Sequence, residues 1–290
     1  MSTVSTHPDR ALHGGKGEAI TRIGPGLALQ SLSPAVLWRY RELAWSLAKR
    51  DFSVRYRQTC LGTLWAVIQP LVSMVVLHVF FGKAMGLEDR VGGVAYPIFL
   101  FAGLLPWNLF TTTITSSTQS LIANQHILTK VYFPRILLPI SAATVPLVDF
   151  ALALVVLFGL MVFLGVSFSV SLLALPVALL GALLSAVGVG LALSALTVWY
   201  RDTRHALPFV MQTWFFMTPV LYPPAILPEG YRWLLMLNPM TGVIDAFRAA
   251  ILDQPMTMST LMMPVAIGSL LMVVGAVIFT RAERSFADVI

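Results

Sequence analysis

The chain has 290 residues, of which 57% are apolar and only 11% are charged, and its mean hydropathy is +0.81. Soluble domains usually carry about a quarter charged residues, so this composition excludes an ordinary soluble protein and indicates an integral membrane protein. The single cysteine, Cys60, excludes a disulfide within the chain and a metal site built from several cysteines.

The N-terminal segment, residues 1–33, is rich in Ser, Thr, Gly, Pro and His, and we expect a disordered tail there. It contains no apolar run, so we expect no cleavable signal peptide. The glycine-rich residues 14–17 lack the leading Gly and the following Ser or Thr of a phosphate-binding loop. Ser33 precedes a proline and predicts a helix start. The segment 35–57 then predicts an amphipathic helix in the membrane interface, because the chain offers no soluble core for it to pack on.

Long apolar stretches dominate the remainder of the chain. A helix needs about 20 apolar residues to cross the hydrocarbon layer. Six stretches meet this length, at about 62–81, 95–117, 136–165, 171–198, 206–222 and 260–280. Between the last two, residues 223–259 are interrupted by prolines and hold apolar pieces too short to span, which predicts a re-entrant helical hairpin. The expected fold is therefore an all-α integral membrane domain over residues 34–285, with six transmembrane helices and a short tail at 286–290.

The positions of Lys and Arg predict the orientation. With the N-terminus inside, fifteen of the nineteen basic residues lie on the cytoplasmic side and four on the other side. Cytoplasmic segments of membrane proteins carry this excess. We therefore expect a multi-pass protein of the cell inner membrane with both termini in the cytoplasm.

Asp149 is the one ionisable residue deep within a predicted span. A carboxylate there costs roughly 2.5–3.5 kcal/mol on insertion scales, so it should face protein or water. It could relay a proton or an ion, or it could hydrogen-bond to a Ser or Thr on a neighbouring span. No second acid, His or Lys lies at a similar depth, which favours polar packing between helices. The chain offers no paired acids and no nucleophile with a base, so we expect no catalytic residue, cofactor site or metal site in it.

Aromatic residues lie inside two predicted spans and near the hairpin. Some of them fit an interfacial belt. Others would offer an apolar surface along which the C–H faces of sugar rings could slide, as a channel for a glycan requires. The candidate channel-lining residues are Trp107, Phe110, Trp214, Phe215, Phe216, Tyr222 and Trp233.

Small residues recur at steps of three and four along the fourth predicted span. Such a face lets two helix backbones approach closely, so we expect it to pack against another helix and not to form a site. Its members are Gly181, Ser185, Gly188, Ala192 and Ala195.

Several stretches together resemble the ABC-type polysaccharide export permeases, a family that includes O-antigen, capsule and teichoic acid exporters. The resemblance runs in order over roughly residues 35–285 and is carried by the segments 56–70 (YRQTCLGTLWAVIQP), 101–107 (FAGLLPW), 130–135 (KVYFPR), 199–202 (WYRD) and 237–242 (LNPMTG). It implies a homodimeric channel driven by separate cytoplasmic ATPase subunits, which would bind the ATP and Mg. It also implies a lipid-linked polysaccharide as the cargo, with no role for nucleic acid.

The resemblance also implies that the cytoplasmic loop after the second span couples the chain to the ATPase. The residues themselves agree, because the basic loop 118–135 reads as a short helix with an apolar stripe and a stiff exit at its proline. The candidate coupling residues are Asn124, Ile127, Leu128, Lys130, Val131, Tyr132, Phe133, Pro134 and Arg135. Secondary cytoplasmic contacts are expected from Arg55, Arg57, Arg201, Asp202 and Arg204.

Two alternatives remain open at the level of sequence. The chain could be an ABC permease for another cargo, such as a drug, haem or a simple lipid. It could also be a membrane-embedded acyl- or glycosyltransferase, which paired intramembrane acids or a His-Asp pair would favour. If the chain is a permease, for a polysaccharide or for another cargo, we expect that it is not itself an enzyme and that ATP hydrolysis occurs in the partner subunit.

Overall fold

A computed structural model describes residues 38–57, 62–91, 93–128, 133–200 and 202–283. The predicted tails at 1–33 and 286–290 lie outside these ranges, as do Cys60, Arg201 and the coupling candidates Lys130, Val131 and Tyr132. Every regular element within the described ranges is helical, which confirms the prediction of an all-α protein.

Five helical segments are long and apolar enough to cross a membrane, so the chain is a multi-pass membrane protein. The first, Gly62–Ala84, consists of η2 (Gly62–Leu64), α3 (Trp65–Leu77) and η3 (His78–Ala84). The second is α4 (Tyr96–Ala123), and the third, Leu137–Phe163, joins α6 (Leu137–Ala142) to α7 (Thr144–Phe163). The fourth is η5 (Val170–Ala174) with α8 (Leu175–Trp199), and the last is α12 (Met258–Glu283). A short turn, η4 (Glu88–Arg90), follows the first segment.

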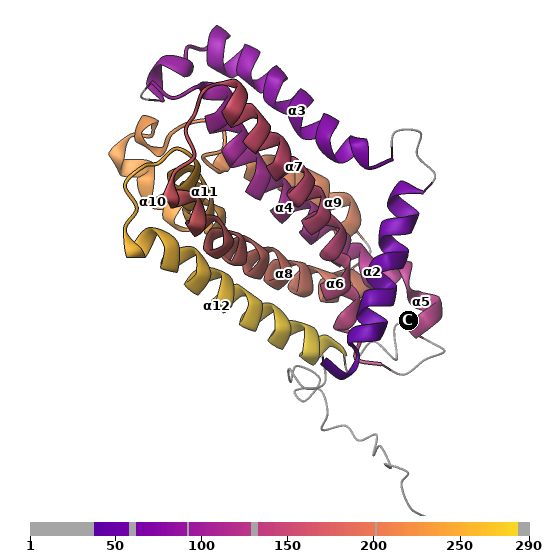
Figure 1. The fold of residues 1–290 in the computed structure, drawn as a ribbon. Helices are drawn as coiled ribbons and strands as arrows, with labels where there is room; N and C mark the ends of the chain where they lie inside the picture. The colour runs from indigo at the N-terminus through magenta and orange to yellow at the C-terminus, as the bar shows by residue number, and fades with distance from the viewer. Residues whose placement is uncertain (1–37, 58–61, 92, 129–132, 201, 284–290) are drawn as a thin grey trace, which may run out of the picture.

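Helix α4 forms the centre of the bundle and is the most deeply buried of the five segments. It packs against α3, α7 and α8, with α3 along one side of the bundle and α12 along the other (Figure 1). Large side chains such as Phe101 and Phe110 are fully buried on it. The first segment is the least covered of the five, and its outer face carries exposed Val72, Val75 and Phe80.

The seam between α8 and α12 is built on glycine. A Cβ atom added to Gly275 would lie 2.0 Å from the carbonyl oxygen of Gly188, and one added to Gly188 would lie 2.5 Å from the backbone of Leu271. Farther along the seam, Gly268 faces the carbonyl oxygen of Gly181. This close backbone approach confirms the prediction that the small residues of the fourth span form a packing face.

The two ends of the bundle are built differently (Figure 1). At one end, the α2 end, α2 (Arg41–Tyr56) lies across the bundle beside α5 (Gln125–Leu128) and packs against α6 and α7. The opposite end, the α11 end, carries α10 (Arg232–Met236) and α11 (Pro239–Ile251). Leu47 of α2 is buried, whereas Trp45 of the same helix is 69% exposed and Trp38, just before it, is 70% exposed. This division fits an amphipathic helix, and its place in the membrane interface stays a prediction.

The fifth predicted span, 206–222, differs from the expectation of one continuous helix. Helix α9 (Thr203–Met217) has 15 residues, fewer than the about 20 that a continuous span needs. Thr218 is extended, with φ −95° and ψ 137°, because it precedes Pro219, and a residue before proline is disfavoured in a helix. The residues after Thr218 continue without helix as far as Pro223. The carbonyl oxygen of Leu221 accepts a hydrogen bond of 2.7 Å from the hydroxyl of Tyr96, the first residue of α4.

The predicted pair of short helices before the last span is present. Two 3₁₀ turns, η6 (Pro224–Ile226) and η7 (Glu229–Tyr231), lead into α10, and the segment 229–236 meets α11 at an angle of 96°. Asn238 shapes this bend. Its Oδ1 accepts a hydrogen bond of 3.0 Å from the amide of Met240, and its Nδ2 donates one of 2.7 Å to the hydroxyl of Thr218. The side chain thus caps α11 and fixes the bend to the end of α9.

Candidate functional site

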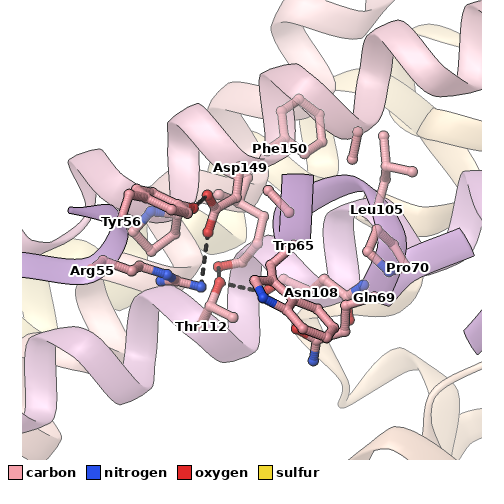
Figure 2. Close-up of a pocket in the computed structure, with 14 residues that line it drawn as sticks. Arg55, Tyr56, Trp65, Gln69, Pro70, Leu105, Asn108, Thr112, Asp149 and Phe150 are labelled. Atoms are coloured by element: carbon pink, nitrogen blue, oxygen red, sulfur yellow. Dashed lines mark hydrogen bonds and ion pairs between the residues drawn. The ribbon is translucent and has the colours of Figure 1, made fainter. Parts of the chain in front are cut away.

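A polar cluster joins the end of α2 to the third span. Nη2 of Arg55 lies 2.9 Å from Oδ2 of Asp149, and the hydroxyl of Tyr56 donates a hydrogen bond to Oδ1 of the same carboxylate (Figure 2). The sequence suggested a Ser or Thr on a neighbouring span as the partner of Asp149. The structure corrects this, because the partners come from the helix before the first span. The ion pair neutralises the carboxylate, which is consistent with a packing role and leaves that role a prediction.

Exposure differs between the members of this cluster. The side chain of Asp149 is 16% exposed and that of Arg55 is 40% exposed, so the guanidinium bridges the buried acid and the surface. Burial, followed by the hydrogen bond to Asp149, raises the pKa of Tyr56 well above its usual range. The phenol therefore remains protonated and remains a donor to the carboxylate at physiological pH.

A cavity of about 110 Å³ opens beside the ion pair, between α2, α3, α4 and α7. Figure 2 shows Trp65 and Gln69 of α3 near Asn108 of α4, with Asp149 across from them. Leu105, Pro70 and Phe150 close the apolar part of the wall. The cavity thus combines an aromatic ring, amide groups and a neutralised carboxylate.

A larger hollow, of about 570 Å³, lies toward the α2 end and shares Arg55 with the smaller cavity. Its lining includes Arg50 and Asp51 of α2, which pair with each other at 2.6 Å. Helix α4 contributes Ser116 and Gln119 to it. The Arg55–Asp149 ion pair therefore stands between two hollows along the same face of α4.

The predicted coupling loop folds against the α2 end. Asn124 is buried and ends α4, and its Nδ2 donates a hydrogen bond of 2.7 Å to the carbonyl oxygen of Ser120. The amide of Arg135 donates one of 3.3 Å to Oε1 of Glu283, at the end of α12. Pro134, just before Arg135, is half-buried. The structure thus brings the loop together with the last turn of the final span.

The apolar stripe of this loop faces inward. Ile127 and Leu128 pack, partly buried, against an apolar cluster at the α2 end that includes Leu47, Phe133 and Phe279. Both are candidate coupling residues. In this conformation they anchor the loop to its own bundle, and their coupling role stays a prediction.

The secondary contact candidates are spread over the α2 end. Arg57, Asp202 and Arg204 are exposed there, near the ends of α2 and α8. Arg55 differs from them because it is paired with Asp149. A role in contacting a partner stays a prediction for all of them.

Four of the seven predicted channel aromatics, Trp107, Phe110, Trp214 and Phe215, gather in one internal cluster. The ring of Trp107 lies 5.7 Å from that of Phe215, and Phe110 meets Trp214 edge-on at 5.2 Å. Phe110 is fully buried and Trp107 is 4% exposed, so α9 covers both rings. In this conformation they pack α4 against α9, and a role in lining a channel stays a prediction for them.

The remaining aromatic candidates lie nearer the surface. Phe216 and Trp233 are 54% and 57% exposed. Tyr222 is half-buried, and its hydroxyl donates a hydrogen bond of 3.4 Å to the carbonyl oxygen of Phe216. Phe216 and Trp233 are the most exposed of the seven candidates, and a role in lining a channel stays a prediction for all of them.

One buried cation at the α11 end was not singled out from the sequence. Arg248 of α11 is 3% exposed and donates three hydrogen bonds to backbone carbonyl oxygens, at 2.7 Å to Pro219, 2.6 Å to Val220 and 3.3 Å to Phe99. Its guanidinium also stacks 3.5 Å from the ring centre of Phe99. The sequence feature that could have identified it is the position of this arginine inside the largely apolar segment 243–252, because a charged residue there needs buried hydrogen-bond partners.

These features define a multi-pass helical membrane protein with a bent pair of helices before its last span. A profile of the ABC-2 type transporter family matches residues 42–252. The O-antigen export system permease protein RfbA of Myxococcus xanthus is 32% identical over 259 residues, which cover 87% of this chain and 96% of that protein. A Klebsiella pneumoniae protein of the same name is 29% identical over 245 residues, 84% of this chain and 93% of its own length.

A more distant relative is the polysialic acid transport protein KpsM of Escherichia coli, which is 23% identical over 210 residues, 71% of this chain and 80% of its own length. The family profile covers well over half of the chain, and the relatives match it through most of their length. The chain belongs to the ABC-2 type transporter family.

Proposed function

We propose that the chain is the permease subunit of an ATP-driven exporter that moves a lipid-linked polysaccharide across the inner membrane. The observation that carries the proposal is the match to O-antigen export permeases over nearly the full length of both chains, at 32% identity for the Myxococcus xanthus protein. The polysialic acid transport protein extends the same kind of cargo to a more distant relative.

The proposed topology has six crossings with both termini in the cytoplasm. The five long helices supply five crossings. The sixth is α9 with the non-helical residues that follow it, because this stretch starts next to the end of α8 and reaches the start of α4, where the hydroxyl of Tyr96 bonds the carbonyl oxygen of Leu221. Lys49, Arg50 and Arg57 at the α2 end support a cytoplasmic location for that end. Helices α10 and α11 would then form a re-entrant element on the periplasmic side.

The proposed assembly is a homodimer with two cytoplasmic ATPase subunits. The sequence holds no phosphate-binding loop, so ATP and Mg would be bound by the partner and not by this chain. The α2 end supports coupling for two reasons. The residues leading into α6 meet the last turn of α12 there through the Arg135–Glu283 hydrogen bond. Ile127 and Leu128 of α5 pack against the same apolar cluster as Leu137 of α6 and Phe279 of α12. A push on α5 would thus reach two spans at once.

The test is a deletion in the native host, with the surface polysaccharide and the intracellular lipid-linked glycan measured together. We expect the deletion to remove the surface polysaccharide and to accumulate the lipid-linked form inside the cell. Plasmid copies of this chain with a catalytically intact ATPase should restore export, and copies with an inactive ATPase should not. Normal surface polysaccharide in the deletion strain would contradict the proposal.

A further inference from the structure

The cavity beside the Arg55–Asp149 pair has the chemistry of a site for a neutral sugar ring. Trp65, which lines it, is 49% exposed and offers an aromatic face to the C–H side of a pyranose. The amides of Gln69 and Asn108 stand in its wall, and neither makes a side-chain hydrogen bond within the described ranges. Amide groups supply both donors and acceptors, which suits hydroxyl groups.

The charges in this wall oppose an anionic ligand. Among the described residues that line the cavity, Arg55 is the one cation, and the carboxylate of Asp149 at 2.9 Å neutralises it. A phosphate placed here would meet Asp149 at close range and would have to displace it. A neutral hydroxyl can instead donate to a free lone pair of the carboxylate while the ion pair stays intact.

A polar line on α4 leads from the α2 end to this cavity. Asn108, Thr112, Ser116 and Gln119 follow one another at steps of four, four and three residues, which places them on one face of the helix. The first two line the smaller cavity and the last two line the larger hollow. Gln119 is exposed at the α2 end and the other three are half-buried. Polar side chains within a membrane span carry a free-energy cost, so a continuous line of them indicates a route that polar molecules can follow.

We propose that the cavity between α2, α3, α4 and α7 binds one neutral sugar residue of the cargo, and that the polar line on α4 is its approach from the α2 end. This inference rests on the proposed polysaccharide export function and names a subsite within it. Trp65 would stack on the ring, Gln69 and Asn108 would bond its hydroxyl groups, and Asp149 would accept from one of them. Arg55 would hold Asp149 in place.

The test uses the full transporter with its ATPase, in cells that make the native cargo. Benzoylphenylalanine is placed at position 69 or 108, and the ATPase is inactivated so that cargo is retained. After irradiation, we expect the glycan to be attached to the chain from both positions. The matched control is position 155 on α7, where Val155 is 67% exposed and lines neither hollow. Attachment of phospholipid at 69 and 108 without glycan would overturn the proposal.

A second measurement uses substitutions with low risk to folding. Gln69 is exposed, so Gln69→Leu should leave the amount of protein in the membrane unchanged and lower the export rate at least five-fold. Gln69→Asn, which keeps the amide, should recover most of the rate. Thr115→Val on α4 is the control, because Thr115 lines neither hollow and its hydroxyl bonds the carbonyl oxygen of Thr111. Normal export by Gln69→Leu would overturn the subsite while leaving the export function intact, whereas normal export in the deletion strain would overturn both.

Discussion

The guanidinium of Arg248 donates a hydrogen bond of 2.6 Å to the carbonyl oxygen of Val220, 28 residues earlier in the chain. Together with the bond to Pro219, it supplies donors to buried carbonyl groups of the non-helical residues that follow α9. Asn238 ties the same segment to the start of α11 through Thr218. The non-helical residues after α9 are thus held in place by the side chains of Asn238, at the start of α11, and Arg248, within α11.

Replacement of Arg248 should therefore weaken the whole α11 end. Arg248→Met keeps much of the volume but leaves three buried carbonyl oxygens without a donor, at a cost of about 3 kcal/mol. Arg248→Lys should recover part of this loss, because an ammonium group cannot reach all three oxygens. Thermal unfolding in detergent measures the effect, and Arg204→Met, at an exposed position, is the control. Equal melting temperatures for Arg248→Met and the control would contradict this role.

The glycine seam predicts a steric effect between α8 and α12. Gly275→Ala places a methyl group where the carbonyl oxygen of Gly188 lies, so the helices must separate, at a cost of about 1–3 kcal/mol. Gly159→Ala on α7 is the matched control, because nothing lies within 4 Å of its added Cβ atom. We expect a lower melting temperature for the first variant alone. Unchanged stability of Gly275→Ala would show that the two helices are farther apart than the structure places them.

The Arg55–Asp149 pair can be tested by a double-mutant cycle. Asp149→Asn keeps an oxygen that can accept from Tyr56 and from the sugar hydroxyl of the proposed subsite, and the half-exposed Arg55 can be solvated, so export should be largely preserved. Asp149→Leu removes both bonds and should lower the amount of folded protein. The double variant Arg55→Gln with Asp149→Asn should lose little more stability than either single variant, because both changes remove the same ion pair. Loss of export in a well-folded Asp149→Asn protein would instead support a proton relay.

Asp253 predicts a pH effect at the α11 end. The hydroxyl groups of Ser169 and Ser171 each donate a hydrogen bond of 2.6 Å to its carboxylate and lower its pKa. Because the folded pKa lies below the unfolded value, this group stabilises the fold above about pH 4 and loses its contribution as the pH falls through the folded pKa. Asp253→Asn should therefore flatten the loss of melting temperature between pH 5 and about pH 3. An identical pH profile for the two proteins would contradict the assignment.

The coupling loop predicts which positions contact a soluble partner. Gln125 and His126 of α5 are exposed, whereas Ile127 and Leu128 pack against the bundle. A cysteine at position 126 should therefore crosslink to the ATPase subunit more strongly than one at position 127 or 128. Ile127→Asp should reduce both coupling and the stability of the loop. The strongest crosslink from position 203, near Asp202, would transfer the coupling role to the loop between α8 and α9.

The long apolar helices and the small-residue seam were predictable because both follow from local patterns, apolar length and spacing. The end of α9 at Met217 was not predicted, because the span was assigned from the number of apolar residues alone. That number does not include the effect of Pro219 on the residue before it. The partner of Asp149 lies 93 residues away in sequence, at Tyr56, and a single sequence contains no information on such a pairing. The inward position of Ile127 could not be predicted either. An amphipathic pattern shows which residues are apolar, but it does not show which part of the protein covers them.

The contact between Gly188 and Gly275 also bears on how the bundle can move. The two backbones are in direct contact, with no flexible side chains between them that could adjust to a sliding motion. We therefore expect α8 and α12 to keep their relative position, as one rigid unit. The first span, by contrast, is held by few buried side chains and ends in a π-helical stretch, His78–Ala84. In a transport cycle built on this fold, we therefore expect the first span to move relative to the rigid pair α8 and α12.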